Sequence, residues 1–398
     1  MRVTQGLEQT QFLTSINQLE SSISQTQNEI STGLSFTTAS QNPIGAGLVT
    51  DYNQVLAQSQ QYQANGTSAQ GGLNIEESAL TQVQNALQSL RDLALQANNA
   101  TVSAQDRSAI AAQATQIQGT LLTLANTQDG SGNYIFAGFA TQTQPFASTS
   151  TGASYAGDQG QRQIQIAAGQ TLGVGDNGDL VFNQIKTGNG TFTATAAAGN
   201  TGSGILGAST VTDPTAYTGA TYSIDFTAPT TYQVVNTATN AVITTGTYTP
   251  GQAIAFSGVQ VTVSGQPAAG DAFTVAPSAN QSVFTTVQDL VTALQTGVTT
   301  PASAVNLNNS IGSAINDIDR ALANTSDVQA SVGGRLNAIT TQQSVATSQQ
   351  TQLQQSISKL QSLDFASAIT NLDQQNTTLS AALQAYTLTQ GLSLFKYI

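Results

Sequence analysis

Apolar residues recur at intervals of three and four positions at both ends of the chain. Near the start, this spacing links Phe12, Ile16, Leu19, Ile23 and Ile30. Near the end, it links Ile369, Leu372, Leu379, Leu383 and Tyr386, with Asn376 as the polar member of the series. The spacing predicts a helix at each end. Because each apolar stripe is narrow, we expect the two helices to pair as a coiled coil formed by residues 1–40 and 360–398.

The same period predicts further helices between these two ends. A first helix over residues 5–32 stops at Gly33, and a later one carries a clear apolar stripe. That stripe consists of Leu73, Leu80, Val83, Leu87, Leu90 and Ala94. The other helix starts lie at Asn42-Pro43, at Ser103 with Asp106 in capping-box spacing, near Val283 and after Pro301. Residues 41–144 and 283–359 are therefore expected to form a helical bundle.

Proline placement and period-two alternation mark a β-rich insert at residues 145–282. Six of the eight prolines lie between Pro145 and Pro277, and proline disfavours helix interiors. The predicted strands are Gln163–Ala167, Leu180–Ile185, Tyr222–Phe226, Tyr232–Val235, Ala241–Tyr248, Val259–Val263 and Ala272–Val275. We expect an antiparallel sandwich or a barrel-like domain. The predicted fold class is therefore α+β and multidomain: a long helical bundle and coiled coil from both chain ends, with an inserted antiparallel β domain.

Composition narrows the classes of function. The chain has 398 residues, and only 8% of them are charged, with Gln, Asn, Ser and Thr in the place of charge. The net charge of −12 and the few basic residues argue against nucleic-acid binding. There is no Cys and no His, so disulfides, thiol chemistry and the commonest general base are excluded. No apolar run approaches the ~20 residues of a membrane helix, so no membrane insertion is expected.

Some polar segments contain residues that could serve a catalytic or metal-binding site, but a purely structural interpretation explains each of them better. Asp129–Asn133 lacks the spacing of a calcium loop, and a tight turn explains it better. Gly175–Asp179 is expected to be a hairpin turn, and Gly199–Gly204 a flexible surface segment. The carboxylate pairs Glu76-Glu77 and Asp317/Asp319 are expected on solvated helix faces. We therefore predict no enzyme activity, no catalytic or metal site and no cofactor.

Four motifs resemble the flagellin superfamily and, within it, the hook–filament junction proteins of bacterial flagella, the third hook-associated proteins. They are Ser31-Thr32-Gly33-Leu34 with Asn42-Pro43-Ile44-Gly45-Ala46, Asp129–Phe139 with Thr143–Phe146, Val332-Gly333-Gly334-Arg335-Leu336-Asn337, and Leu360–Ile398. The resemblance covers residues 1–146 and 283–398. Inside the insert, Gly258–Val275 with Gly270-Asp271-Ala272-Phe273 resembles a hook-associated β module. Ser35 stands where the family usually has a basic residue.

The resemblance implies a structural adaptor between the hook side and the flagellin filament. The implied partners are like subunits in a ring, the first hook-associated protein, flagellin, and an export chaperone before secretion. The terminal helices are expected to supply the assembly interface, which adds Leu392, Leu394 and Phe395 to the two apolar stripes. Two alternatives remain: a flagellin-like filament subunit, and a secreted adhesin or glycan-binding protein that presents its β domain on a helical stalk.

The expected location is the extracellular flagellum. The first residues, Met1–Asn17, contain no basic region followed by an apolar core. We therefore expect export through the flagellar secretion apparatus without a cleaved signal peptide.

Overall fold

The computed structural model describes residues 2–99 and 101–391, without the side chains of residues 2–5 and 389–391. The chain forms two compact units, one from residues 1–64 with 342–398 and the other from residues 65–341. Two long helices, α2 (Pro43–Ala97) and α5 (Pro301–Gln361), contribute residues to both units. Among the described residues, no helix is both long and apolar enough to cross a membrane.

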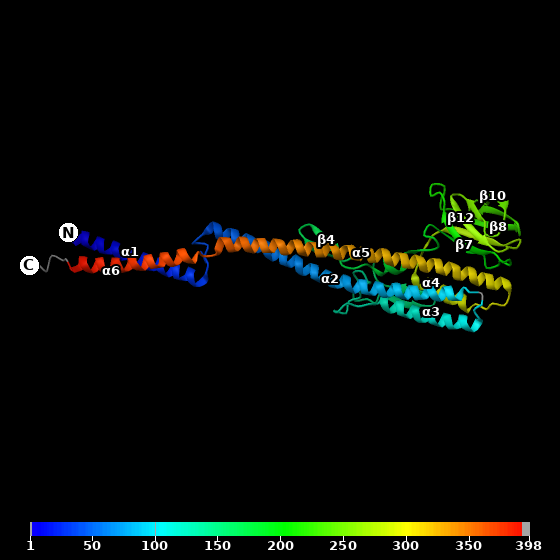
Figure 1. The fold of residues 1–398 in the computed structure, drawn as a ribbon, viewed down its shortest axis with the longest axis horizontal. Coiled ribbons are helices and arrows are strands. Elements are labelled where there is room, and N and C mark those ends of the chain that lie inside the picture. Colours follow the sequence, from blue (N-terminus) through cyan, green and yellow to red (C-terminus); the bar gives the residue numbers. More distant parts are fainter. Residues whose placement is uncertain (1, 100, 392–398) are drawn as a thin grey trace, which may run out of the picture. The chain divides into compact units, whose positions relative to one another are not determined.

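The unit formed by the two chain ends is helical (Figure 1). Helix α1 (Arg2–Thr32) lies beside helix α6 (Phe365–Gly391), and the start of α2 and the end of α5 complete the unit. Helix α1 ends at Gly33, which has a φ of 69° and so supplies the left-handed residue that commonly closes a helix. Helix α2 begins at Pro43 with the Asn42 side chain accepting from the backbone N–H of Gly45 at 2.9 Å. Both boundaries confirm the sequence prediction.

The core of the second unit lies between α2, α5, α3 (Ala104–Ala125) and α4 (Val283–Gln295). The predicted stripe of α2 is fully buried there, and every side chain from Leu73 to Ala94 in that stripe is at most 1% exposed. Ser103 caps α3 by accepting from the N–H of Asp106, and Ser282 caps α4 by accepting from the N–H of Phe284. Capping satisfies amides that the first turn leaves free, which fixes where each helix begins.

The segment that follows α3 packs into this helical core through its aromatic residues. It contains two short hairpins, formed by β1 (Phe146–Thr149) with β2 (Gly152–Tyr155) and by β3 (Gln163–Ala167) with β4 (Gln170–Gly173). The rings of Phe146 and Phe182 are 5.3 Å apart, and each also contacts Phe284 of α4. These residues and the helical stripes share one buried cluster.

The predicted strand at Leu180–Ile185 is wrong. Asp179–Asn183 form a single turn of π-helix, η1, and only Ile185–Lys186 are extended, as strand β5. Val181 and Phe182 are adjacent and both 1% exposed, whereas neighbouring residues of a strand point to opposite faces. A helical turn lets both side chains enter the same core. The expected hairpin turn at Gly175–Asp179 is wrong for the same reason, because this stretch leads from β4 into η1.

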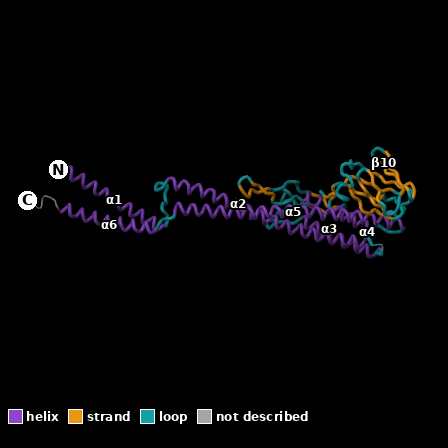
Figure 2. The backbone as a smooth tube through the Cα atoms, turned by 45° about the horizontal axis from the view of Figure 1, so that its top comes forward, coloured by secondary structure: helices purple, strands orange, loops and turns teal. Residues whose placement is uncertain are grey.

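A two-layer β sandwich occupies residues 192–277. One sheet has the order β10-β9-β8-β13-β6 and the other β11-β12-β7, with every pairing antiparallel. The strands are β6 (Phe192–Ala196), β7 (Ile205–Val211), β8 (Tyr222–Ala228), β9 (Thr231–Asn236), β10 (Ala241–Thr247), β11 (Ala253–Phe256), β12 (Val259–Ser264) and β13 (Ala272–Pro277). Figure 2 shows them as one compact group around the label β10.

Alternate residues of the sandwich strands form its core. Tyr222, Ile224 and Phe226 of β8 and the three valines of β12 are buried, as period-two patterning requires. This core is separate from that of the helices. The chain enters the sandwich after β5 and leaves it before β14 (Asn280–Gln281), and these two strands pair with each other. The sandwich therefore joins the bundle through a two-stranded neck.

The segment Gly199–Gly204 is held by hydrogen bonds to a buried side chain, so the prediction of a flexible surface segment is wrong. Asp271, only 2% exposed, accepts from the backbone N–H groups of Thr201 at 2.8 Å and Gly202 at 3.0 Å. It also accepts from the N–H of Ala268 at 2.8 Å. A buried carboxylate that satisfies several backbone amides fixes the loop that supplies them.

The predicted fold class is confirmed: helices from both chain ends carry an inserted antiparallel β domain. The division into a coiled coil, a bundle and an outer domain at residues 40, 144, 282 and 360 stays a prediction. Residues 146–185 share the buried cluster of the helices, whereas residues 192–275 form a cluster of their own.

Candidate assembly interface

Helices α1 and α6 form an antiparallel pair although they lie at opposite ends of the sequence (Figure 1). Near one end of the pair, the Thr26 hydroxyl donates to the Gln375 side-chain oxygen at 3.3 Å. Near the other, the rings of Phe12 and Tyr386 stack with centroids 4.7 Å apart, and Gln9 donates to the Tyr386 hydroxyl at 3.1 Å. The predicted pairing of the two chain ends is thus present in the single chain.

The seam on α1 follows the predicted spacing. Ile16 and Ile23 are buried, and Phe12, Leu19 and Ile30 are half-buried. Thr26 is also buried, at 8% exposure, and continues the same series as its polar member. Its hydroxyl donates to the Ser22 carbonyl as well as to Gln375, which satisfies it inside the seam.

The seam on α6 differs by one position from the predicted stripe. Leu372, Leu379 and Tyr386 are half-buried as expected, but Ile369 is 49% exposed and Leu383 is 46% exposed. Asn376 is exposed too. Their places in the seam are taken by the smaller or more flexible residues Ala368, Gln375 and Ala382. Small side chains let the α1 backbone approach closely, so the larger Ile369 and Leu383 remain on the outer edge.

The pair therefore presents an uncovered apolar edge. Sequence reasoning placed Ile369 and Leu383 in the interface, and the structure leaves both accessible in the single chain. Further apolar side chains that the two predicted stripes do not include are also exposed, namely Leu7, Leu13, Ile44, Leu48, Val55, Val345, Phe365 and Leu388. Ile44, Leu48 and Val55 recur at helical spacing on α2, and that recurrence was a signal available in the sequence. The predicted interface residues Leu392, Leu394 and Phe395 lie outside the described residues.

The connection between the pair and the long helices is fixed by backbone hydrogen bonds. The N–H of Ser35 donates to the Gln361 carbonyl at 2.7 Å, and the N–H of Leu363 donates to the Gly33 carbonyl at 3.0 Å. The Ser35 hydroxyl donates to the Leu360 carbonyl at 3.3 Å. A hydroxyl thus supplies a local contact at this turn.

The expectation of solvated faces is wrong for Glu76, which is buried, and for Asp317, which is half-buried, whereas the Asp319 side chain stays 37% exposed. Asp319 forms an ion pair with Arg91 at 2.6 Å. The backbone N–H of Gly188 donates to Asp317 at 2.7 Å, and burial raises the pKa of Asp317 to about 6. These partners come from distant parts of the chain, which helical spacing alone does not reveal.

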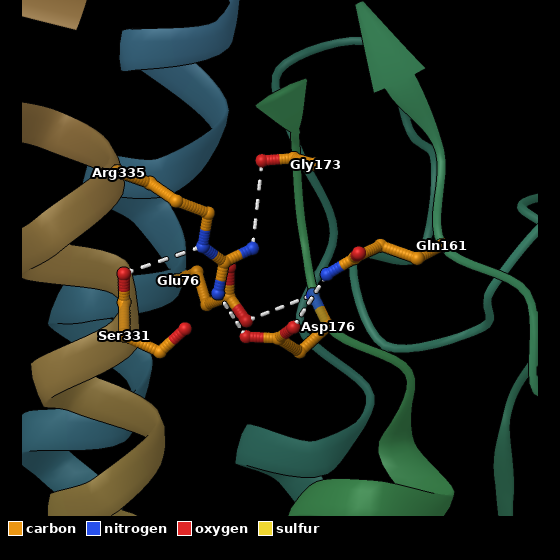
Figure 3. A network of polar contacts seen from close by, with 6 residues as sticks. All are labelled: Glu76, Gln161, Gly173, Asp176, Ser331 and Arg335. Carbon is orange, nitrogen blue, oxygen red and sulfur yellow. Dashed lines mark hydrogen bonds and ion pairs between the residues drawn. The ribbon is translucent and has the colours of Figure 1, made fainter. Parts of the chain in front are cut away.

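Glu76 belongs to a buried polar network in the second unit (Figure 3). Its carboxylate accepts from the backbone N–H of Asp176 at 3.0 Å, and the Asp176 carboxylate pairs with Arg335 of α5. Gln161 donates to Asp176 at 2.8 Å, and Arg335 donates to the Gly173 carbonyl at 3.4 Å. Burial raises the pKa of Glu76 to about 8. Arg335 of the Gly-Gly-Arg motif thus ties the loop after β4 to the long helices.

The Asp129 loop is a tight turn, as expected. One Asp129 oxygen accepts from the N–H groups of Ser131 at 2.8 Å and Asn133 at 3.0 Å. These backbone bonds hold the pKa of Asp129 below its usual value against the opposing effect of desolvation. The carboxylate therefore closes the turn through its own backbone.

Known proteins match the chain over both its helical and its β-rich parts. The model of the family described as "Bacterial flagellin N-terminal helical region" matches residues 3–141. The crystal structure of Xanthomonas campestris FlgL is 35% identical, with a TM-score of 0.72, and the match covers 77% of this chain and 99% of that one. The chain belongs to the FlgL family.

Two further FlgL-family matches agree. The flagellar hook-associated protein-3 structure from Legionella pneumophila is 30% identical with a TM-score of 0.74, covering 78% of this chain and 98% of that one. Flagellar hook-associated protein 3 of Salmonella typhimurium is 33% identical over 187 residues, or 47% of this chain. The matched stretch spans 58% of the length of that Salmonella protein. The resemblance to the hook-associated junction family that the motifs indicated is confirmed.

The sandwich has a match of its own. The family model described as "Flagellar hook-associated protein 1, D2-like domain" matches residues 195–277. These residues run from β6 to the end of β13 and include the buried Asp271. The hook-associated β module that Gly270-Asp271-Ala272-Phe273 indicated is therefore found in this FlgL-family chain.

Proposed function

We propose that this protein is a structural adaptor of the bacterial flagellum that joins the hook side to the flagellin filament. The observation that carries the proposal is the 35% identity that extends over 99% of a FlgL chain. The uncovered apolar edge of the α1–α6 pair supports it, because exposed Ile369 and Leu383 need a neighbouring molecule to be buried. The interface comprises the stripes of Phe12–Ile30 and Ile369–Tyr386, with Leu392, Leu394 and Phe395.

The proposed partners are a ring of like subunits, the first hook-associated protein on one side and flagellin on the other. A flagellar export chaperone would hold the chain before secretion. Passage through the flagellar secretion apparatus requires an unfolded chain, and a sequence with no Cys forms no disulfide that would obstruct it. No observation favours catalysis, and we propose a purely structural role.

The alternatives have weaker support. A filament subunit would share the helical region matched at residues 3–141, but it would not account for the full-length identity to FlgL. An adhesin would use the β sandwich, whose match is to a domain of another hook-associated protein.

Removal of the gene from its native cells tests the proposal. We expect hooks without filaments, and flagellin accumulating in the culture medium. Electron microscopy and a flagellin blot of the supernatant would measure both, and labelled protein restored to the cells should appear at the base of each filament. Label along the whole filament would support the subunit alternative. Normal filaments with lost attachment would support the adhesin.

A further inference from the structure

The network around Glu76 contains more negative than positive charge. Two carboxylates, Glu76 and Asp176, face the single guanidinium of Arg335. Glu76 is 1% exposed and Asp176 is 6% exposed, so water screens neither well. Among the described residues, one Glu76 oxygen, Oε2, has no hydrogen-bond partner. A buried carboxylate with an unpartnered oxygen and excess negative charge is strongly disfavoured.

The surrounding residues do not restore the balance. The charged groups that face Glu76 in the described part of the chain are Asp176, from the loop after β4, and Arg335, from α5. On its own helix, the neighbouring Glu77 accepts instead from Gln329 at 3.4 Å. One proton on Glu76 would neutralise the excess negative charge of this network.

We propose that a proton on Glu76 latches residues 161–176 onto helices α2 and α5, and that rising pH loosens this segment. The segment contains the β3–β4 hairpin. Asn65 of α2 donates to the Gln165 carbonyl at 2.8 Å, and Arg335 of α5 donates to the Gly173 carbonyl, so the helices hold the hairpin at two places. The Asp176 backbone bond to Glu76 closes the latch at the end of the segment.

The direction of the pH effect follows from linkage. Burial, and then the Asp176 carboxylate, raise the pKa of Glu76 to about 8 in the closed state, whereas an exposed Glu has a value near 4.5. The closed state therefore binds the proton more tightly than the open state. Its extra stability is complete below pH ~4.5, falls as pH rises, and is lost above pH ~8.

Hydrogen exchange of the full chain between pH 5 and 9 tests the latch. The readout is the protection factor of residues 161–176, after division by the intrinsic exchange rate at each pH. In the wild type, protection should fall by up to about tenfold per pH unit between pH 5 and 8 and then level off. In Glu76→Gln, whose amide mimics the protonated acid, protection should stay constant.

Two further variants make the outcome decisive. Glu77→Gln removes the same charge at the adjacent position and should keep the wild-type slope. Asp176→Asn removes the second of the two causes that raise the Glu76 pKa, while burial remains, so its protection should level off at a lower pH than in the wild type. Circular dichroism would verify that each variant is helical. A wild-type profile in either Glu76→Gln or Asp176→Asn would overturn the proposal, and neither measurement depends on the flagellar role.

Discussion

The ring of Phe12 lies against the ring of Tyr386 with an interplanar angle of 7° and a centroid separation of 4.7 Å. The two residues are near opposite ends of the sequence, so their contact joins the two chain-terminal helices, α1 and α6. Both side chains are only half-buried. The pair of chain-terminal helices thus depends on a thin seam, in contrast to the fully buried stripe of α2.

A double-mutant cycle measures what this contact contributes. Phe12→Leu and Tyr386→Leu should each speed hydrogen exchange in α1 and α6 of a verified monomer. Because the stacked rings stabilise each other, the double variant should lose ~0.5–1.5 kcal/mol less than the sum of the single losses. Leu13→Ala, at an exposed position beside Phe12, is the control and should change exchange little. Strict additivity of the two substitutions would contradict the contact.

The period of apolar residues predicted most of the helical architecture correctly, because that signal is local. It placed Ile16 and Ile23 in the α1 seam, and it identified the stripe that is buried on α2. On α6 it chose Ile369 and Leu383 because they are large and apolar, whereas the structure uses Ala368 and Ala382. The distance between the α1 and α6 backbones decides which of these residues enter the seam. That distance depends on α1 as well as on α6.

Local sequence patterns do not predict contacts between segments that are distant along the chain. Nothing next to Glu76 in the sequence indicates that Asp176 and Arg335 will surround it. The same holds for Asp271, which accepts hydrogen bonds from the loop around Gly202 only because the fold of the sandwich brings them together. The sequence around Val181-Phe182 does not distinguish a strand from a buried helical turn, because apolar runs of this length fit both.

Asp317 should make the stability of the second unit depend on pH. Burial raises its pKa to about 6, with Asp289 adding to the effect and the Gly188 hydrogen bond opposing it. The folded state thus binds the proton more tightly, and the stability it provides is lost as pH rises from ~4 through ~6. Asp317→Asn keeps the acceptor for Gly188 and should remove this loss. Thermal unfolding at pH 4 and pH 7 should show a relative gain of roughly 1 kcal/mol at pH 7.

Exposed Asp51 provides the control for this measurement. Asp51→Asn removes the same charge from a solvated position and should leave the difference between pH 4 and pH 7 unchanged. An Asp317→Asn profile that matches the wild type would show that the carboxyl at position 317 titrates normally.

Two deletions should distinguish the sandwich from the segment that supports the bundle. In the neck, Lys186 pairs with Asn280, so a short Gly linker can replace residues 187–279 without moving either strand. This deletion should leave the helical bundle folded, because the sandwich core is separate. Removal of residues 150–278 also takes away Val181, Phe182 and Ile185, each buried in the helical core, and should destabilise the bundle by several kcal/mol.

Circular dichroism and thermal unfolding of the two deletion variants would measure this difference. If both variants kept a wild-type bundle, the aromatic contacts of Phe182 would not support it. If the shorter deletion unfolded the bundle, the sandwich would be part of its core. Motility of cells carrying the shorter deletion would then report any separate role of the sandwich.

Substitutions at Leu379 and Leu383 should distinguish the folding of the α1–α6 pair from its assembly with other molecules. Leu379 is half-buried on the α6 seam, so Leu379→Asp should open the pair in the monomer, at a cost on the order of a few kcal/mol. Leu383 is 46% exposed, so Leu383→Asp should leave monomer exchange unchanged. In an assembly that covers this edge, the same substitution buries an unpaired charge in every subunit. Cells with this variant should therefore form hooks, export the protein and release flagellin into the medium.

Gln384→Asp is the matched control, because it adds the same charge at the next position of α6, where the native side chain is polar and exposed. It should preserve both monomer exchange and filament growth if the apolar edge, rather than added charge, governs assembly. Electron microscopy of the cells and a flagellin blot of the supernatant would compare the variants. Filaments of normal length with Leu383→Asp would remove Leu383 from the interface, because a buried, unpaired carboxylate repeated around a ring would not leave assembly unaffected.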